Sequence, residues 1–133
     1  LGEYLATAEA FEELAARTDD PKARALGRSL LEAVGRVLDG GYSPGRKVRE
    51  LDNRGTNFYV ALFWAEALSA HEPMFADLAS ALRDGLPRIL EDLASCQGAP
   101  VDLGGYYKPD PEKVAMAMRP SELFNSLIDN RAG

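Results

Sequence analysis

The stretch NFYVALFWAEALSA, residues 57–70, is rich in helix formers and is apolar on most sides of the helix that it would form. A helix with one apolar stripe lies at the surface of a fold, whereas a helix that is apolar all round needs neighbours on several sides. We therefore expect this segment to be the central helix of the protein. Phe63 and Trp64, its adjacent large aromatic residues, are predicted to lie in the core.

Segments on both sides of this stretch carry the periodicity of amphipathic helices. Such helices are predicted over residues 2–18, 21–39, 74–95, 111–119 and 121–129. Their ends carry signals of their own, since Asp110 and Ser121 are N-cap residue types and the pair Gly40 and Gly41 ends a helix. Pro87 falls inside a predicted helix, where it removes a backbone donor, so a kink or a break is expected near it.

Two stretches lack this periodicity and are predicted to be irregular loops: residues 42–56, and QGAPVDLGGYY at residues 97–107. The sequence as a whole therefore predicts an all-α fold over residues 1–133. We expect a single antiparallel, bundle-like helical domain of five to six helices that carries these two loops.

Length and composition fit one soluble domain and exclude several classes of protein. A chain of 133 residues can bury about two-thirds of the surface that its unfolded form exposes. No stretch approaches the ~18 apolar residues of a membrane span, and a pI near 4.8 argues against nucleic-acid binding. Cys96, the single cysteine, is predicted to be a reduced, buried thiol, which favours a cytoplasmic location. The opening LGEYL has neither a signal-peptide pattern nor an initiator Met, so we expect the chain to begin inside a larger protein.

The stretch SPGRKVRELDNRGTNFY, residues 43–59, gathers four cations in a chain of net charge −6: Arg46, Lys47, Arg49 and Arg54. Asn53 and Thr56 are N-cap residue types, and a helix that begins near Gly55 would direct its positive dipole end towards these cations. Guanidinium groups beside a helix N-terminus can bind phosphate. Alternatively, the interleaved Glu50 and Asp52 pair with the cations at the surface, for under about 1 kcal/mol per ion pair. The residues alone leave both interpretations open and favour the ion pairs.

The remaining candidate residues carry weaker signals. His71, the single histidine, has no second histidine with which to form a metal site. The GGYY run at residues 104–107 either brings backbone close to a ligand or covers the core with its tyrosines. The sequence contains no Walker-type phosphate loop, no dinucleotide fingerprint and no cysteine and histidine cluster. No catalytic residue and no metal ligand is therefore predicted in this chain.

Three stretches of the chain combine into a specific pattern: LGEYLATAEAFEELAARTDDPKARAL at 1–26, SPGRKVRELDNRGTNFYVALFWAEAL at 43–68 and QGAPVDLGGYYKPDPEKVAMAMRPSELFN at 97–125. In order and spacing they resemble the C-terminal end of the monomeric NADP-dependent isocitrate dehydrogenases. The specific features are the SPxRKV run, the DNRG turn followed by two aromatic residues, the GGYY loop and the RPS-x-x-FN ending. The resemblance covers nearly the whole chain.

The resemblance implies an enzyme that oxidises isocitrate with NADP and decarboxylates it to 2-oxoglutarate, with Mg or Mn as the metal. It also implies a longer chain whose other segments carry the metal carboxylates and the acid and base residues. The segment seen here would then be inactive alone and bind no metal, and its partners would be the rest of the dehydrogenase chain and NADP. For the coenzyme, the resemblance implies that Arg46, Lys47, Arg54 and Asn57 contact the ribose 2′-phosphate that distinguishes NADP from NAD.

Three residues depart from the family pattern, of which Pro87 bears on the straightness of its helix rather than on the function. Asn57 stands where the family commonly has a histidine, so it can donate a hydrogen bond but carries no charge. Arg49 stands where a small residue is more usual. Because the catalytic segments are missing, two alternatives remain: a free-standing helical binding module derived from the enzyme, and a helical interaction domain whose basic loop binds an acidic partner protein. Faces that the rest of the enzyme would cover also predict self-association of the isolated chain.

Overall fold

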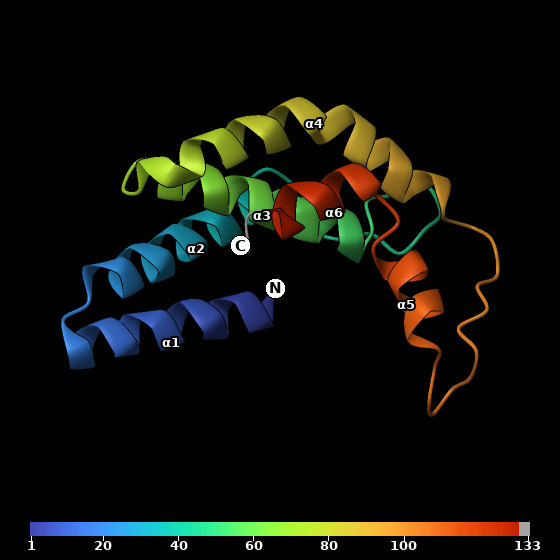
Figure 1. Ribbon diagram of the computed structural model, residues 1–133, viewed down its shortest axis with the longest axis horizontal. Helices are drawn as coiled ribbons and strands as arrows, with labels where there is room; N and C mark the ends of the chain where they lie inside the picture. Colours follow the sequence, from blue (N-terminus) through green and yellow to red (C-terminus); the bar gives the residue numbers. More distant parts are fainter. Residues whose placement is uncertain (131–133) are drawn as a thin grey trace.

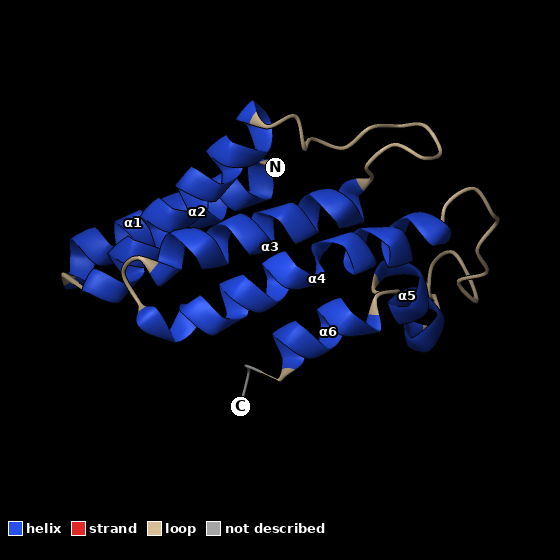
Figure 2. Cartoon of the chain, turned by 90° about the horizontal axis from the view of Figure 1, so that it is seen from above, coloured by secondary structure: helices blue, strands red, loops and turns tan. Residues whose placement is uncertain are grey.

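The computed structural model describes residues 1–130, which form helices joined by turns and loops (Figure 1; Figure 2). The helices are α1 (Gly2–Thr18), α2 (Pro21–Asp39), α3 (Asn53–Ser69), α4 (Ala76–Ser95), α5 (Pro111–Met118) and α6 (Glu122–Asp129), with a short 3-10 turn, η1 (Pro73–Phe75), before α4. No strand occurs in this described range, so the predicted all-α fold is confirmed.

The long helices pack in sequence order, each antiparallel to the one before it (Figure 1). α1 packs on α2, α2 on α3 and α3 on α4, while the shorter α6 lies against α4. α5 stands at one end of this layer and has no buried residue (Figure 1). The end of the layer where α3 begins and α4 ends is therefore built by loops and by α5 rather than by long helices.

α3 is the centre of the core, as its apolar composition predicts. It packs against both α2 and α4, and its residues Phe58 and Leu62 are fully buried. Leu30 of α2 and Ile89 of α4 are also fully buried and belong to the same apolar cluster. Burial on both flanks explains why this helix carries no polar face, since nearly every side of it meets another helix.

The two aromatic residues predicted to lie in the core differ in burial. Phe63 is buried, and the Arg36 guanidinium lies over its ring at 4.0 Å from the centroid while it also bonds to Glu66. Trp64 is only partly buried. Its indole Nε1–H donates to the Leu26 carbonyl at 3.2 Å, which keeps the ring at the edge where α2 and α3 meet.

Local sequence sets where several helices begin and how closely two of them pack. Asp20, Asp110 and Ser121 accept hydrogen bonds from backbone amides two or three residues later, as N-caps do. The caps predicted for the last two helices are therefore confirmed. Gly27 lets α2 approach α1 closely, because a Cβ at this position would lie 2.9 Å from the Ala8 carbonyl oxygen.

Other predictions about the helices are corrected or decided by the structure. α3 begins at Asn53 rather than near Gly55, because the side chain of Asp52 caps it. α4 is bent but continuous through Pro87, whose ring is exposed (Figure 1). Cys96 is exposed rather than buried, since it follows the last residue of α4.

The outer face of α2 keeps apolar side chains at the surface. Leu31 and Leu38, which the sequence pattern predicts to face the core, are 56% and 55% exposed. The adjacent Leu30 and Val37 already occupy the core side of the helix, and successive helical residues point in different directions.

Of the helices in the described range, none is long and apolar enough to cross a lipid bilayer.

Replacing Leu62 by Ala is expected to lower the free energy of unfolding by about 2–5 kcal/mol, because it leaves a cavity in a fully packed part of the core. Leu31→Ala is the matched control, since Leu31 lies inside α2 but is 56% exposed, and it should cost less than about 1 kcal/mol. Urea unfolding of the chain, followed by circular dichroism, measures both values. Equal losses for the two variants would contradict the central position of α3.

Candidate functional site

Both irregular loops lie at the end of the helical layer where α3 begins and α4 ends (Figure 1). Residues 40–52 connect α2 to α3 and contain Arg46, Lys47 and Arg49 of the basic cluster, and residues 96–110 connect α4 to α5. Tyr106 and Tyr107 of the second loop are 90% and 96% exposed, so they do not cover the core. The candidate site is the region in which these two loops meet.

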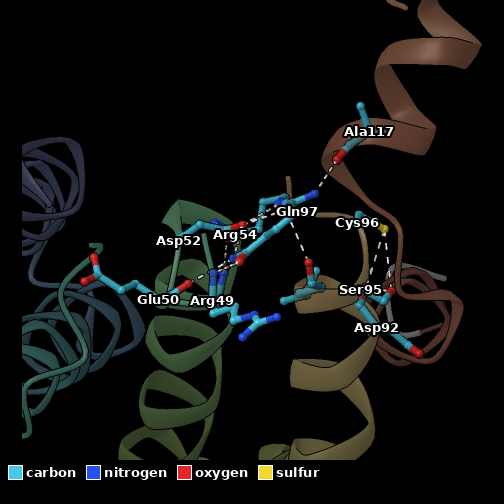
Figure 3. Close-up of polar contacts among 11 residues, drawn as sticks. Arg49, Glu50, Asp52, Arg54, Asp92, Ser95, Cys96, Gln97 and Ala117 are labelled. Carbon is cyan, nitrogen blue, oxygen red and sulfur yellow. Dashed lines mark hydrogen bonds and ion pairs between the residues drawn. The ribbon is translucent and has the colours of Figure 1, made fainter. Parts of the chain in front are cut away.

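Asp52 is the residue around which this region is organised (Figure 3). Its Oδ1 caps α3 by accepting from the backbone N–H groups of Arg54 and Gly55, at 2.9 and 3.2 Å. Its Oδ2 accepts from Nε and Nη2 of Arg54, at 3.1 and 2.6 Å, and from Nε2 of Gln97, at 3.1 Å. One carboxylate thus serves as helix cap, ion-pair partner and acceptor for the second loop.

The predicted N-caps, Asn53 and Thr56, are wrong for a physical reason. The Asp52 carboxylate reaches the first amides of α3, so these amides are already bonded and do not face the cations unpaired. Thr56 lies inside the helix, and its Oγ1 donates to the Tyr42 carbonyl at 2.7 Å. That bond fastens the first loop to the side of α3.

The Arg54 guanidinium is bonded mainly to the protein itself. Besides its bonds to Asp52, Nη1 donates to the Ala117 carbonyl at 2.9 Å and Nη2 donates to the Leu93 carbonyl at 3.2 Å (Figure 3). The side chain is only 17% exposed. These contacts join α3 to α4 and α5 and leave at most one N–H, on Nη1, for a ligand.

Arg46 and Lys47 are placed differently from Arg54. Both residues are exposed, and among residues 1–130 neither side chain makes an ion pair. Glu50 does not pair with their charged ends, because its Oε2 accepts from their backbone N–H groups, at 3.0 and 3.1 Å. Of the two interpretations of the basic cluster, ion pairing thus describes Arg54 with Asp52 but neither of these two cations.

Arg49 adopts a left-handed backbone conformation, with φ of +76°. Such a conformation strains any residue that has a Cβ and suits glycine best. This is a physical reason for a small residue to be more usual at the position. In this chain the strained backbone is held by a tertiary contact, because the Arg49 N–H donates to Oε1 of Gln97 at 2.7 Å.

Asn57 lies one turn into α3 and is exposed. Its Oδ1 accepts from the Tyr4 hydroxyl at 2.8 Å, which ties the start of α1 to α3. Asn57 and Arg54 both line a cavity of about 430 Å³ bounded by α3, α4, α5 and α6, whereas Arg46 and Lys47 do not line it. The structure therefore brings the four predicted coenzyme residues together as two separate pairs.

This region of the molecule can receive an anion but offers little else. Exposed cationic ends project from the first loop, and side-chain amide and guanidinium groups border the cavity. Such donors suit a phosphate or a carboxylate. Among residues 1–130, no group of three or more histidine, cysteine, aspartate or glutamate side chains is arranged to hold a metal ion.

Sequence reasoning missed Gln97, which joins the two loops. It lies 45 residues from Asp52 in the sequence and belongs to no local motif, so nothing near it indicated its partners. The cap at Asp52 carried a usable signal, since an aspartate directly before a helix is a strong N-cap type.

The acidity of Asp52 reflects its contacts. Partial burial raises the pKa of its carboxyl, but the hydrogen bonds from Arg54, Gln97 and Gly55, together with the Arg54 charge, outweigh this effect and leave the pKa below its ordinary value of 3.8. Because the folded-state pKa is depressed, the carboxylate stabilises the fold fully above the unfolded-state pKa. This contribution is lost as the pH falls through the folded-state pKa.

Asp52→Asn keeps an N-capping side chain but removes the charge. We expect it to lower the free energy of unfolding by about 1–3 kcal/mol at neutral pH, because the Arg54 guanidinium loses its charged acceptor. The difference from the wild type should shrink as the pH falls below about 4. Urea unfolding at several pH values measures it, and a difference independent of pH would show that the charge plays no part.

Arg49→Gly is expected to be more stable than Arg49→Ala by about 1 kcal/mol, since both remove the long side chain and only glycine relieves the left-handed strain. Ala10→Gly is the control, because Ala10 is exposed inside α1 and the exchange there should destabilise by about 1 kcal/mol. Thermal unfolding ranks the variants. Equal stability of the two Arg49 variants would mean that no strain is stored at this position.

Comparison with known proteins finds one family along almost the whole chain. A family model described as monomeric isocitrate dehydrogenase matches residues 1–129. The chain is 44% identical over 134 residues to an NADP isocitrate dehydrogenase of Azotobacter vinelandii, with 96% of the chain covered. It is 42% identical over 135 residues to one from Mycobacterium tuberculosis and 41% identical over 135 residues to one from Corynebacterium glutamicum, with 97% of the chain covered in each case.

The chain spans 18% of the length of each of these curated relatives. The matched range includes the basic loop, Gln97 and all the helices described above. On this evidence the chain belongs to the monomeric isocitrate dehydrogenase family.

Proposed function

We propose that this chain is the C-terminal portion of an NADP-dependent isocitrate dehydrogenase, which oxidises and decarboxylates isocitrate to 2-oxoglutarate and CO2. Family membership and the names of the relatives support the activity, and the 18% coverage of those relatives supports a segment of a longer enzyme. The longer enzyme acts in the cytoplasm. This segment is inactive alone, because the acid, base and metal-binding residues that the resemblance implies belong to other segments.

Within that enzyme the segment contributes to the side of the coenzyme site that binds the 2′-phosphate. One observation carries this proposal: Arg46 and Lys47 are exposed on a loop whose backbone is fixed by Glu50, and no ion pair among residues 1–130 neutralises them. A phosphate monoester carries nearly two negative charges at neutral pH, so cations that are not paired within the protein can bind it strongly. The residues present therefore fit the group that distinguishes NADP from NAD.

The other two coenzyme residues contribute less charge. Arg54 can offer at most one N–H without breaking its bonds to Asp52, Leu93 and Ala117, so its main part is to hold this end of the site together. Asn57 offers a neutral amide. The Mg or Mn ion of the complete enzyme is bound by carboxylates of its other segments.

Exposed apolar residues on the second loop and α5 support contact with the rest of the dehydrogenase. Tyr106, Tyr107, Met116 and Met118 are all more than half exposed. Exposed apolar side chains of this kind favour an interface. The same exposure supports the alternative of a helical interaction module, and it predicts self-association when the chain is isolated.

The coenzyme role is tested by Arg46→Ala combined with Lys47→Ala in the full-length enzyme. We expect KM for NADP to rise about 5- to 150-fold, the loss of about 1–3 kcal/mol of charged hydrogen bonding, with kcat little changed. KM for NAD should not rise, since NAD lacks the phosphate. Lys22→Ala is the control for the loss of an exposed positive charge elsewhere, because Lys22 is exposed at the start of α2, far from the loops (Figure 1). An unchanged KM for NADP, or an equal rise for NAD, would exclude the proposed contact.

A further inference from the structure

Gln97 follows α4, yet its side chain is bonded to the end of the basic loop (Figure 3). Its Oε1 accepts from the Arg49 N–H at 2.7 Å. Its Nε2 donates to the Glu50 carbonyl at 2.9 Å and to Oδ2 of Asp52 at 3.1 Å. Both N–H groups of the amide and its oxygen are thus used, and every partner belongs to the same four-residue stretch, 49–52.

These bonds hold the part of the loop whose backbone is strained. Arg49 has a φ of +76°, a conformation that persists only where surrounding contacts impose it. The Gln97 amide supplies an acceptor to the Arg49 N–H and a donor to the carbonyl of the next residue, Glu50. The next residue, Gly98, has a φ of +84°, which glycine adopts without strain, and a Cβ there would lie 3.2 Å from Cγ1 of Val48.

Hydrogen bonds of Glu50 connect this part of the loop to the exposed cations Arg46 and Lys47. The Glu50 N–H donates to the Lys47 carbonyl at 3.1 Å. The Glu50 carboxylate accepts from the backbone N–H groups of Arg46 and Lys47, at 3.0 and 3.1 Å. Gln97 fixes the backbone of Glu50, and the Glu50 carboxylate fixes the backbone of Arg46 and Lys47. Gln97 therefore constrains the backbone of both cations through Glu50.

We propose that Gln97 is a positioning residue for the coenzyme, which holds the basic loop in the conformation that presents Arg46 and Lys47 to the 2′-phosphate. The inference rests on the proposed function of that loop. A loop that is already ordered loses less conformational entropy when a ligand binds, so the ligand binds with higher affinity. Gln97 acts through the loop, and its loss should therefore change KM for NADP far more than kcat.

Hydrogen exchange of the full-length enzyme without coenzyme tests the positioning directly. In Gln97→Ala the Arg49 N–H loses its acceptor, so exchange of a peptide covering residues 46–51 should be faster by about tenfold or more. Ser95→Ala is the control, because its hydroxyl bonds to the Asp92 carbonyl within α4 and contacts only the neighbouring Cys96 thiol otherwise. Unchanged exchange in Gln97→Ala would overturn the proposal, whatever the activity of the variant.

Steady-state kinetics provide a second readout with a near-isosteric variant. Gln97→Ala should raise KM for NADP about tenfold and leave kcat within about twofold. Gln97→Glu keeps the oxygen that accepts from Arg49 but places a carboxylate against the Glu50 carbonyl and the Asp52 carboxylate. Protonation of the new carboxylate restores a donor. The KM of Gln97→Glu for NADP, relative to that of the wild type, should therefore fall as the pH is lowered from about 8 to about 5. The ratio of KM in Gln97→Ala to KM in the wild type should not fall over the same pH range. If the two variants showed the same pH profile, the proposal would be overturned.

The two proposals fail in different ways. If the combined Arg46→Ala and Lys47→Ala variant leaves KM for NADP unchanged, the loop is not the phosphate site, and the proposed function fails together with the role of Gln97. If that variant raises KM but both Gln97 variants bind NADP as the wild type does, only the positioning role is overturned.

Discussion

The carboxylate of Asp52 must satisfy a helix end and a partly buried guanidinium at the same time. It caps α3 with one oxygen and pairs with Arg54 through the other. Because Arg54 reaches on to the carbonyls of Leu93 and Ala117, this charge joins α3 to α4 and α5. Removing either partner would leave the other charged and partly desolvated, which costs more than an exposed ion pair contributes. The arrangement of both loops depends on this pair.

The ion pair between Asp52 and Arg54 distinguishes Arg54 from the exposed cations of the loop. Arg54 lies among the helix ends, where its charge is neutralised and most of its donors are bonded internally. Arg46 and Lys47 sit on the outer turn, where Glu50 bonds only to their backbone, so their charges stay in solvent. These three cations, which lie within nine residues of the sequence, thus differ in what they can offer a ligand. Phosphate binding needs donors that are not already paired within the protein.

Features that depend on neighbours in the sequence could be predicted well. The caps at Asp110 and Ser121 are correct because an N-cap bonds to amides only two or three residues away. The central position of α3 is correct because an apolar helix has no face that water favours. Burial of individual residues was less accurate, as Cys96 and Trp64 show, since both lie where a helix ends or two helices meet at an edge. Periodicity identifies the inner face of a helix but does not say how far the neighbouring helix covers it.

The helices, most of their ends, the two irregular loops and the family could all be identified from the amino-acid pattern. This pattern also located the basic cluster and its carboxylates. Only the tertiary structure decided which cation is paired, that Asp52 rather than Asn53 caps α3, and that Gln97 holds the strained Arg49 backbone. The reason is physical: helix formation and capping are short-range, whereas the partner of Gln97 lies 45 or more residues away and comes within hydrogen-bonding distance only when α3 and α4 pack side by side.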